Sequence, residues 1–149
     1  MNFYTSTTFR ESLASLTKKS KDGYTTVVQD ICEALAEMQD NILRDTNDRV
    51  FQFPEYRVVK LRIANSGQKL SKSNGFRLIY WVSLLHDNVV LMRVYPKRGP
   101  QAAVDLVNAE YTRLQVEVFN ESKANQLHQV DITNGLAELC QNGCLSCNR

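Results

Sequence analysis

Two adjacent stretches of the sequence decide the fold: FRLIYWVSLL, residues 76–85, and VVLMRVY, residues 89–95. Both are rich in β-branched and aromatic residues, which favour strands. The short polar segment His86-Asp87-Asn88 between them is typical of a hairpin turn. Pro96 ends the second strand, because proline cannot donate a hydrogen bond to a sheet. We therefore expect a central antiparallel pair.

A third strand is predicted at residues 56–63, where apolar residues and cations alternate with a period of two. The alternation places Lys60 and Arg62 on one face of that strand, and Leu61 and Ile63 on the other. A polar loop then leads to the central pair.

The N-terminal part of the chain is predicted to be mainly helical. Residues 3–5 resemble a short strand. A first helix begins at a capping box formed by Thr8 and Glu11. A second amphipathic helix covers about residues 25–43, and the two form a hairpin that must cover an apolar surface. Residues 44–54 are polar and are predicted to be a connection.

The fold expected from these elements is α+β: a small antiparallel sheet packed against an N-terminal helical hairpin, with the helices on one face. A C-terminal helix follows Gly99-Pro100 and ends near Phe119. We expect one domain at residues 1–119 and an extension of unknown role at residues 120–149, with a helix around 134–140.

Composition narrows the class of protein. A chain of 149 residues with 43% hydrophobic content suggests one globular domain. No apolar run approaches the ~18 residues that indicate a transmembrane helix. The first residues lack the basic and apolar regions of a secretory signal. We expect a cytoplasmic protein that has no contact with a membrane.

The cysteines allow two interpretations. Cys32 stands alone in a helical pattern and is predicted to be a small buried residue. Cys140, Cys144 and Cys147 form a C-x3-C-x2-C cluster that could ligate a metal together with His128. We favour a reduced tail, because the second couplet of a typical zinc site is missing, and we expect neither a metal nor a cofactor.

Positive charge is concentrated in the strand-rich region. Residues 56–98 contain nine of the eighteen Lys and Arg residues and a single acid, Asp87, which gives a net charge of +8. The rest of the chain carries −6, so the overall net charge of +2 hides the asymmetry. A basic sheet of this kind is typical of a polyanion-binding surface.

Five cations are predicted to converge where the strands are paired: Lys60, Arg62, Arg77, Lys97 and Arg98. Like charges on neighbouring strands repel one another, so an anion is the expected partner, and phosphate suits the bidentate geometry of arginine. The alternative is a solvated face with salt bridges to the acidic helices, although the window contains only one acid.

The aromatic residues between these cations also allow two interpretations. Exposed rings can stack on nucleic-acid bases, but mid-strand Phe76, Tyr80 and Trp81 are better explained as core residues. Tyr95, at a strand end beside Lys97, is the best candidate for a solvent-exposed ring. The sequence contains no HExxH motif, P-loop or GxGxxG motif. An enzyme would therefore have to work with Lys, Arg or Tyr.

Three segments resemble the RelE/ParE superfamily of toxins from bacterial toxin–antitoxin pairs: YRVVKLR at 56–62, GFRLIY at 75–80 and VYPKR at 94–98. The resemblance covers roughly residues 3–119. It implies an endoribonuclease that enters the ribosomal A site and cuts mRNA by attack of a 2′-hydroxyl on the adjacent phosphate. It also implies a cognate antitoxin as the protein partner, and it leaves homodimer formation open.

The resemblance assigns roles to particular residues. Lys60 would activate the 2′-hydroxyl, Arg77 would stabilise the pentacovalent phosphate, and Arg98 would hold the scissile phosphate or assist the leaving oxygen. Tyr95 or Tyr111 is the candidate proton carrier, since residues 99–106 contain neither Tyr nor His. Further RNA contacts are expected from the remaining cations of the region: Arg57, Arg62, Lys69, Lys72 and Lys97.

Two other functions stay open. One is a non-enzymatic toxin of the gyrase-inhibiting branch; retention of Lys60, Arg77 and Arg98 argues against it. The other is a catalytically inactive, RNA-binding or regulatory relative, which stays open because the expected proton carrier is missing.

Overall fold

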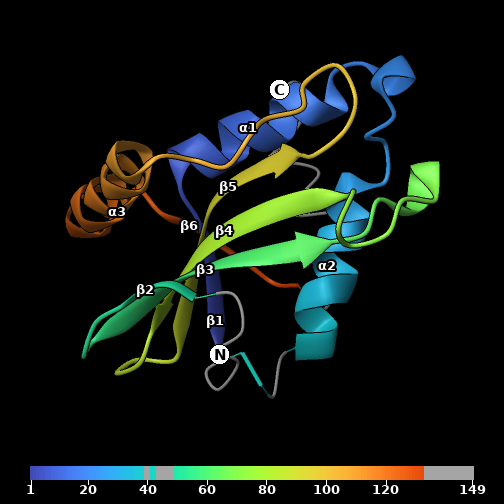
Figure 1. Ribbon diagram of the computed structural model, residues 1–149. Helices are drawn as coiled ribbons and strands as arrows, with labels where there is room; N and C mark the ends of the chain where they lie inside the picture. The colour runs from blue at the N-terminus through green and yellow to red at the C-terminus, as the bar shows by residue number, and fades with distance from the viewer. Residues whose placement is uncertain (39–40, 43–48, 133–149) are drawn as a thin grey trace.

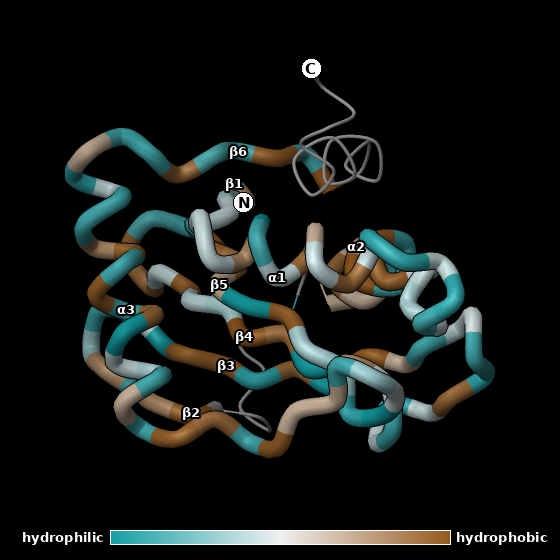
Figure 2. Tube along the Cα trace, turned by 90° about the horizontal axis from the view of Figure 1, so that it is seen from above, coloured by the Kyte–Doolittle hydropathy of each residue, from teal (hydrophilic) through white to brown (hydrophobic). Residues whose placement is uncertain are grey.

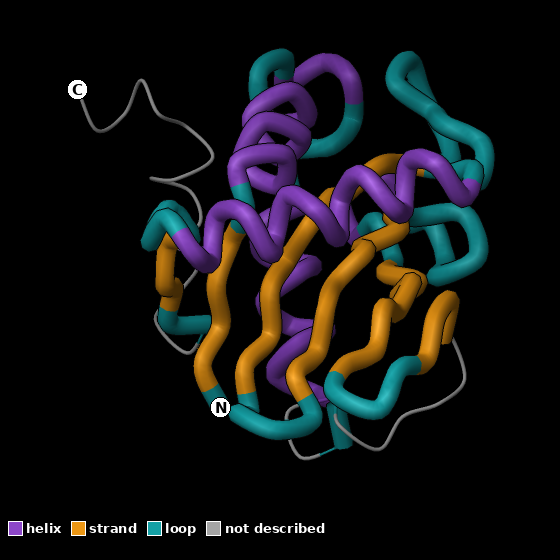
Figure 3. Tube along the Cα trace, turned by 90° about the vertical axis from the view of Figure 1, so that its left-hand side faces the viewer, coloured by secondary structure: helices purple, strands orange, loops and turns teal. Residues whose placement is uncertain are grey.

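The part of the chain that the structure describes forms three layers, with helices on both faces of a six-stranded sheet (Figure 1). The computed structural model describes residues 1–38, 41–42 and 49–132. Helices α1 (Thr7–Thr17) and α2 (Val27–Met38) pack on one face. Helix α3 (Asn108–Lys123) crosses the strands on the opposite face (Figure 3).

The sheet has the strand order β2-β3-β4-β5-β1-β6. In chain order its strands are β1 (Asn2–Thr5), β2 (Arg49–Gln52), β3 (Tyr56–Ile63), β4 (Phe76–Ser83), β5 (Asn88–Pro96) and β6 (His128–Val130). Strand β1 runs parallel to β5, and every other pair is antiparallel. The sheet is therefore mixed.

The strands expected at residues 56–63, 76–85 and 89–95 are confirmed as β3, β4 and β5. Their alternation is also confirmed, because Leu61 and Ile63 pack toward α2, whereas Val58 packs toward α3. Much of β3 and β4 carries hydrophobic colouring in Figure 2. Strand β4 is buried at seven of its eight positions, as expected of a strand covered on both faces.

The predicted architecture is wrong. The sheet is neither small nor antiparallel throughout, and the helices are not a hairpin confined to one face. Strands β2 and β6 have four and three residues, which is too short for a period of two to be recognised. The parallel pairing of β1 with β5 joins residues more than eighty positions apart, and no local pattern signals such a pairing. Helix α3 covers a second apolar face formed by Val58, Ile79, Val90 and Met92.

The predicted start of α1 is also wrong. The N-cap is Ser6, whose Oγ accepts a hydrogen bond from the N–H of Phe9 at 3.3 Å. The Thr8 hydroxyl instead donates to Glu117 of α3 at 2.8 Å. Glu121 accepts a hydrogen bond from the N–H of Thr7 at 3.0 Å. Two carboxylates of α3 thus satisfy the free donors at the start of α1, where negative charge is favoured.

The start predicted for the C-terminal extension, Asn120, lies inside α3. Residues 128–130 form β6, and Val130 and Ile132 are buried in the core beneath α1 and α2. The helix predicted at 134–140 and the three clustered cysteines lie outside the described residues. His128 lies in β6, and Cys32 is half-buried in α2, where burial raises the pKa of its thiol to about 11.

None of the described helices has the length and apolar character needed to cross a membrane.

Candidate nucleic-acid interface

Five predicted site residues lie at one end of the sheet and are called the basic cluster: Lys60, Arg62, Arg77, Lys97 and Arg98. The end of β3, the start of β4 and the segment after β5 meet there. Register places Arg77 directly between Arg62 on β3 and Tyr95 on β5. Lys60, two residues earlier on β3, shares the face of Arg62.

Lys60 forms an ion pair with Asp105, a residue for which no role was predicted. Its Nζ lies 3.3 Å from Oδ1 of Asp105. Asp105 belongs to the segment between β5 and α3, residues 99–107, which we call the strap. The hydrogen bond from Lys60 lowers the pKa of Asp105, and the positive charges of Lys60, Lys97 and Arg77 lower it further. Three cations from separate parts of the chain therefore act on one carboxylate.

Arg77 is nearly buried, with 7% of its surface exposed. Its Nη1 donates to the carbonyl oxygens of Lys72 at 2.9 Å and Phe76 at 3.2 Å, and its Nη2 donates to that of Ser73 at 2.9 Å. The guanidinium thus supports the loop before β4 while adding its charge to the basic cluster.

Arg98 is tied to the same loop, because its Nε donates to Oδ1 of Asn74 at 3.1 Å. Its backbone carbonyl accepts a hydrogen bond from the Tyr24 hydroxyl at 2.9 Å, and that hydroxyl accepts one from the N–H of Gln101 at 3.0 Å. Gly99 lies between, with φ +93°, and a Cβ there would be 2.5 Å from the Tyr24 oxygen. Tyr24 therefore positions Arg98 and the start of the strap, a role with no signature in the sequence.

The loop that carries Lys69 and Lys72 is anchored to α2. Asp30, 5% exposed, accepts hydrogen bonds from the N–H and the hydroxyl of Ser66. Both lysines are exposed. Arg57 does not join the basic cluster, because strand alternation places it on the α2 side of β3.

Tyr95 is not the solvent-exposed ring that the sequence suggested. It is 2% exposed, and its hydroxyl has no hydrogen-bond partner among the described residues. Burial raises its pKa to about 12, with electrostatic contributions from Tyr111 and Asp105. The ring is packed beneath α3 and the strap, so it cannot exchange a proton with a ligand on the surface.

Replacing Tyr95 with phenylalanine is expected to raise the free energy of unfolding by about 1 kcal/mol, because it removes a buried hydroxyl that lacks a partner. The folded pKa of Tyr95 lies above its unfolded value of about 10, so its ionisation leaves the stability of the wild-type protein unchanged below pH ~10 and lowers it between about pH 10 and 12. Urea unfolding across this range should show a smaller loss in the Tyr95→Phe variant. A variant less stable than the wild type at neutral pH would contradict the account.

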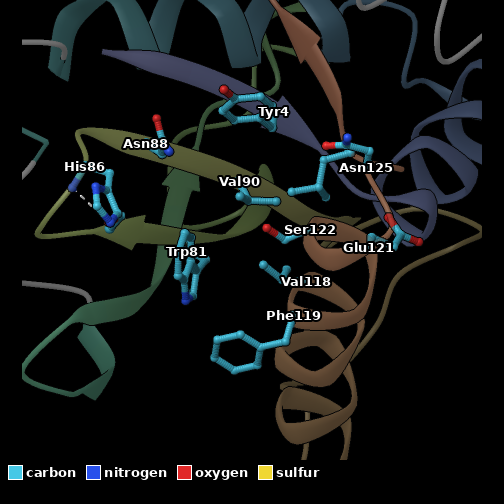
Figure 4. Close-up of a pocket in the computed structure, with 12 residues that line it drawn as sticks. Tyr4, Trp81, His86, Asn88, Val90, Val118, Phe119, Glu121, Ser122 and Asn125 are labelled. Atoms are coloured by element: carbon cyan, nitrogen blue, oxygen red, sulfur yellow. Dashed lines mark hydrogen bonds between the residues drawn. The ribbon is translucent and has the colours of Figure 1, made fainter.

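A second hollow lies on the same face of the sheet, beside the C-terminal half of α3 (Figure 4). It is a cavity of about 270 Å³ lined by side chains that include Tyr4, Trp81, His86, Val118 and Phe119. No member of the basic cluster lines it. It was missed in the sequence because its residues are scattered from β1 to α3.

Within the described ranges, no group of three His, Cys, Asp or Glu side chains is placed to hold a metal ion. The basic cluster is the candidate site because five cations from β3, β4 and the segment after β5 meet there. Comparisons with protein-family models, with curated proteins and with solved structures find no match to this chain.

Proposed function

We propose that the protein is a RelE-type toxin that binds mRNA through the basic cluster and cleaves it, and that a cognate antitoxin neutralises it. The observation that supports this most is the convergence of Lys60, Arg77 and Lys97 on the single carboxylate of Asp105. These residues belong to β3, β4 and the segment just after β5, so only the folded sheet brings them together.

An RNA phosphate is the ligand that this arrangement suits best. Two arginines face each other across β3 and β4, and directly opposed like charges destabilise a sheet. An anion bound near them would offset that repulsion, as the carboxylate of Asp105 does for the charge of Lys60. Arg62 and Arg98 are exposed at the edge of the cluster, where they can contact further phosphates of a single strand.

Cleavage would depend on preorganised charge. In the proposed mechanism the ammonium of Lys60 lies beside the attacking 2′-hydroxyl and stabilises the alkoxide that develops there, while the hydroxyl proton passes to solvent. Arg77 and Arg98 stabilise the negative charge that develops on the phosphate, an effect that can contribute about 3 kcal/mol for each well-placed donor. Arg98 is exposed, so it can contact the leaving oxygen directly. Arg77 would act through its positive charge alone, because its Nη donors are bonded to carbonyl oxygens.

RNA binding without cleavage is the second candidate, and two specific observations favour it. Tyr95, the predicted proton carrier, is buried with a raised pKa. Arg77 directs its Nη groups to the loop before β4. A protein that binds RNA at the basic cluster but lacks a proton carrier would still compete with other ligands of the ribosome or the transcript.

Fluorescence anisotropy with a short labelled single-stranded RNA tests the binding step. The Lys60→Ala change is expected to weaken binding about fivefold at low salt and to flatten the slope of log K against log salt by about 0.7, the value for one phosphate contact to a single strand. Lys97→Ala should act in the same direction. The matched control is Lys123→Ala, at the far end of α3, which should leave both quantities unchanged. Equal effects for all three variants would contradict a localised site.

Primer extension on mRNA after induction of the protein separates the two candidates. Codon-phased cuts that disappear in Lys60→Ala would support the endoribonuclease. RNA binding that is sensitive to Lys60, without any cuts, would favour the second candidate. Absence of both binding and cuts would overturn the proposed function.

A further inference from the structure

We propose that Asp105 is an internal competitor of RNA: its carboxylate occupies the position that a phosphate takes at Lys60, and RNA binding displaces it. This inference rests on the proposed RNA binding and adds a residue that sets its affinity. In this view the strap lowers the affinity of the basic cluster for RNA through the carboxylate of Asp105.

The geometry at Lys60 carries the proposal. The Lys60–Asp105 distance of 3.3 Å is that of a direct ion pair, so a phosphate cannot take the same position while the carboxylate stays. The Asp105 side chain is 65% exposed and that of Lys60 is 26% exposed. The pair therefore lies at the surface, where an incoming anion can reach it. The charges of Lys97 and Arg77 also lower the pKa of Asp105, so the carboxylate lies within the field of three cations.

The strap is built so that Asp105 can move away. Its start is fixed by Tyr24 and by a hydrogen bond from the N–H of Ala103 to the carbonyl of Pro96. Its end is fixed by Glu110, which accepts a hydrogen bond from the N–H of Val107. Between these points, the backbone of residues 104–106 makes no hydrogen bond within the described part of the chain. Asp105 can thus leave Lys60 without breaking a backbone hydrogen bond.

An alternative role for Asp105 predicts the opposite effect on binding. If the carboxylate held Lys60 in its working orientation, its removal would weaken RNA binding. The exposure of Asp105 argues against this, because an exposed ion pair orients a lysine only weakly. The sign of the change in affinity therefore distinguishes a competitor from a positioning residue.

The test is the Asp105→Asn variant, measured by anisotropy with the same single-stranded RNA. We expect RNA to bind about fivefold more tightly at low salt, the upper range for an exposed ion pair, and the advantage to shrink as salt rises. The matched control is Glu110→Gln, which neutralises the carboxylate of a comparable ion pair, Arg93–Glu110 at 3.2 Å, outside the basic cluster. Glutamine can still accept the hydrogen bond from the N–H of Val107. A gain confined to Asp105→Asn would support the proposal.

A double-mutant cycle separates the local effect from a change in net charge. In the Lys60→Ala background, Asp105→Asn should give well under half of its gain. An undiminished gain there, an equal gain in Glu110→Gln, or weaker binding in Asp105→Asn would each overturn the competitor role. In all three cases RNA binding that depends on Lys60 would still support the proposed function. Loss of that dependence would overturn the proposed function itself.

Discussion

The Gly75→Ala change is expected to lower the free energy of unfolding by about 3 kcal/mol or more, because no space exists for a side chain. A Cβ at this position would lie 2.0 Å from the carbonyl oxygen of Ile63 and 2.7 Å from the backbone nitrogen of Asn65. Both are backbone atoms, so neither can move aside as a flexible side chain could. The carbonyl of Gly75 also accepts a hydrogen bond from the N–H of Lys97 at 2.8 Å. A shift of Gly75 would therefore displace one cation of the basic cluster.

Gly67→Ala in the same loop is the matched control. Its Cβ would meet the side chain of Thr26, with the nearest atom at 3.0 Å, and a side chain can adjust. We expect a loss of less than about 1 kcal/mol, the usual range for a surface change. Urea unfolding of the two variants measures the difference. Equal stabilities of the two variants would contradict the close approach of the Gly75 backbone to Ile63 and Asn65.

The Arg77→Ala change is expected to have the second-largest effect, a loss of about 3 kcal/mol of stability, because it removes three hydrogen bonds from a nearly buried charged group. It should also weaken RNA binding more than Lys60→Ala does. The reason is that the loop supported by Arg77 presents Asn74, which in turn holds Arg98. Loss of cleavage in Arg77→Ala would therefore not by itself identify a catalytic group.

Arg77→Lys separates the two contributions. Lysine keeps the charge but cannot bond to the carbonyls of Lys72, Phe76 and Ser73 with the geometry of a guanidinium. We expect this variant to lose much of the stability while it keeps most of the salt dependence of RNA binding. Chemical denaturation and anisotropy on the same preparations measure both. An Arg77→Ala protein as stable as the wild type would show that the loop does not depend on this side chain.

The sequence predicted the middle of the sheet well, because β3, β4 and β5 are long enough to show their period. That period also predicted that Lys60 and Arg62 lie on the same face of the sheet. The same reasoning could not find β2 or β6, which have four and three residues. It also missed the meaning of the nearly continuous apolar run in β4, which signals burial on both faces and hence a helix on each side.

The sequence pointed to the cations of the candidate site but not to the residues that hold them in place. Charge counting located Lys60, Arg77 and Lys97, because cations are visible residue by residue. Asp105 and Tyr24 act through tertiary contacts across 45 and 74 positions, so no local motif marks them. The burial of Tyr95 depends on the strap and α3 lying over it, an arrangement that the one-sided fold prediction excluded.

An NMR titration locates the RNA on the folded protein and so shows whether it binds at the basic cluster. A short single-stranded RNA is added to the isotopically labelled protein, and backbone amide shifts are followed residue by residue. We expect the largest changes at Lys60, Lys97 and Asp105, and small changes at Trp81 and Phe119 beside the second hollow. Changes centred on that hollow, or none at saturating RNA, would contradict RNA binding at the basic cluster.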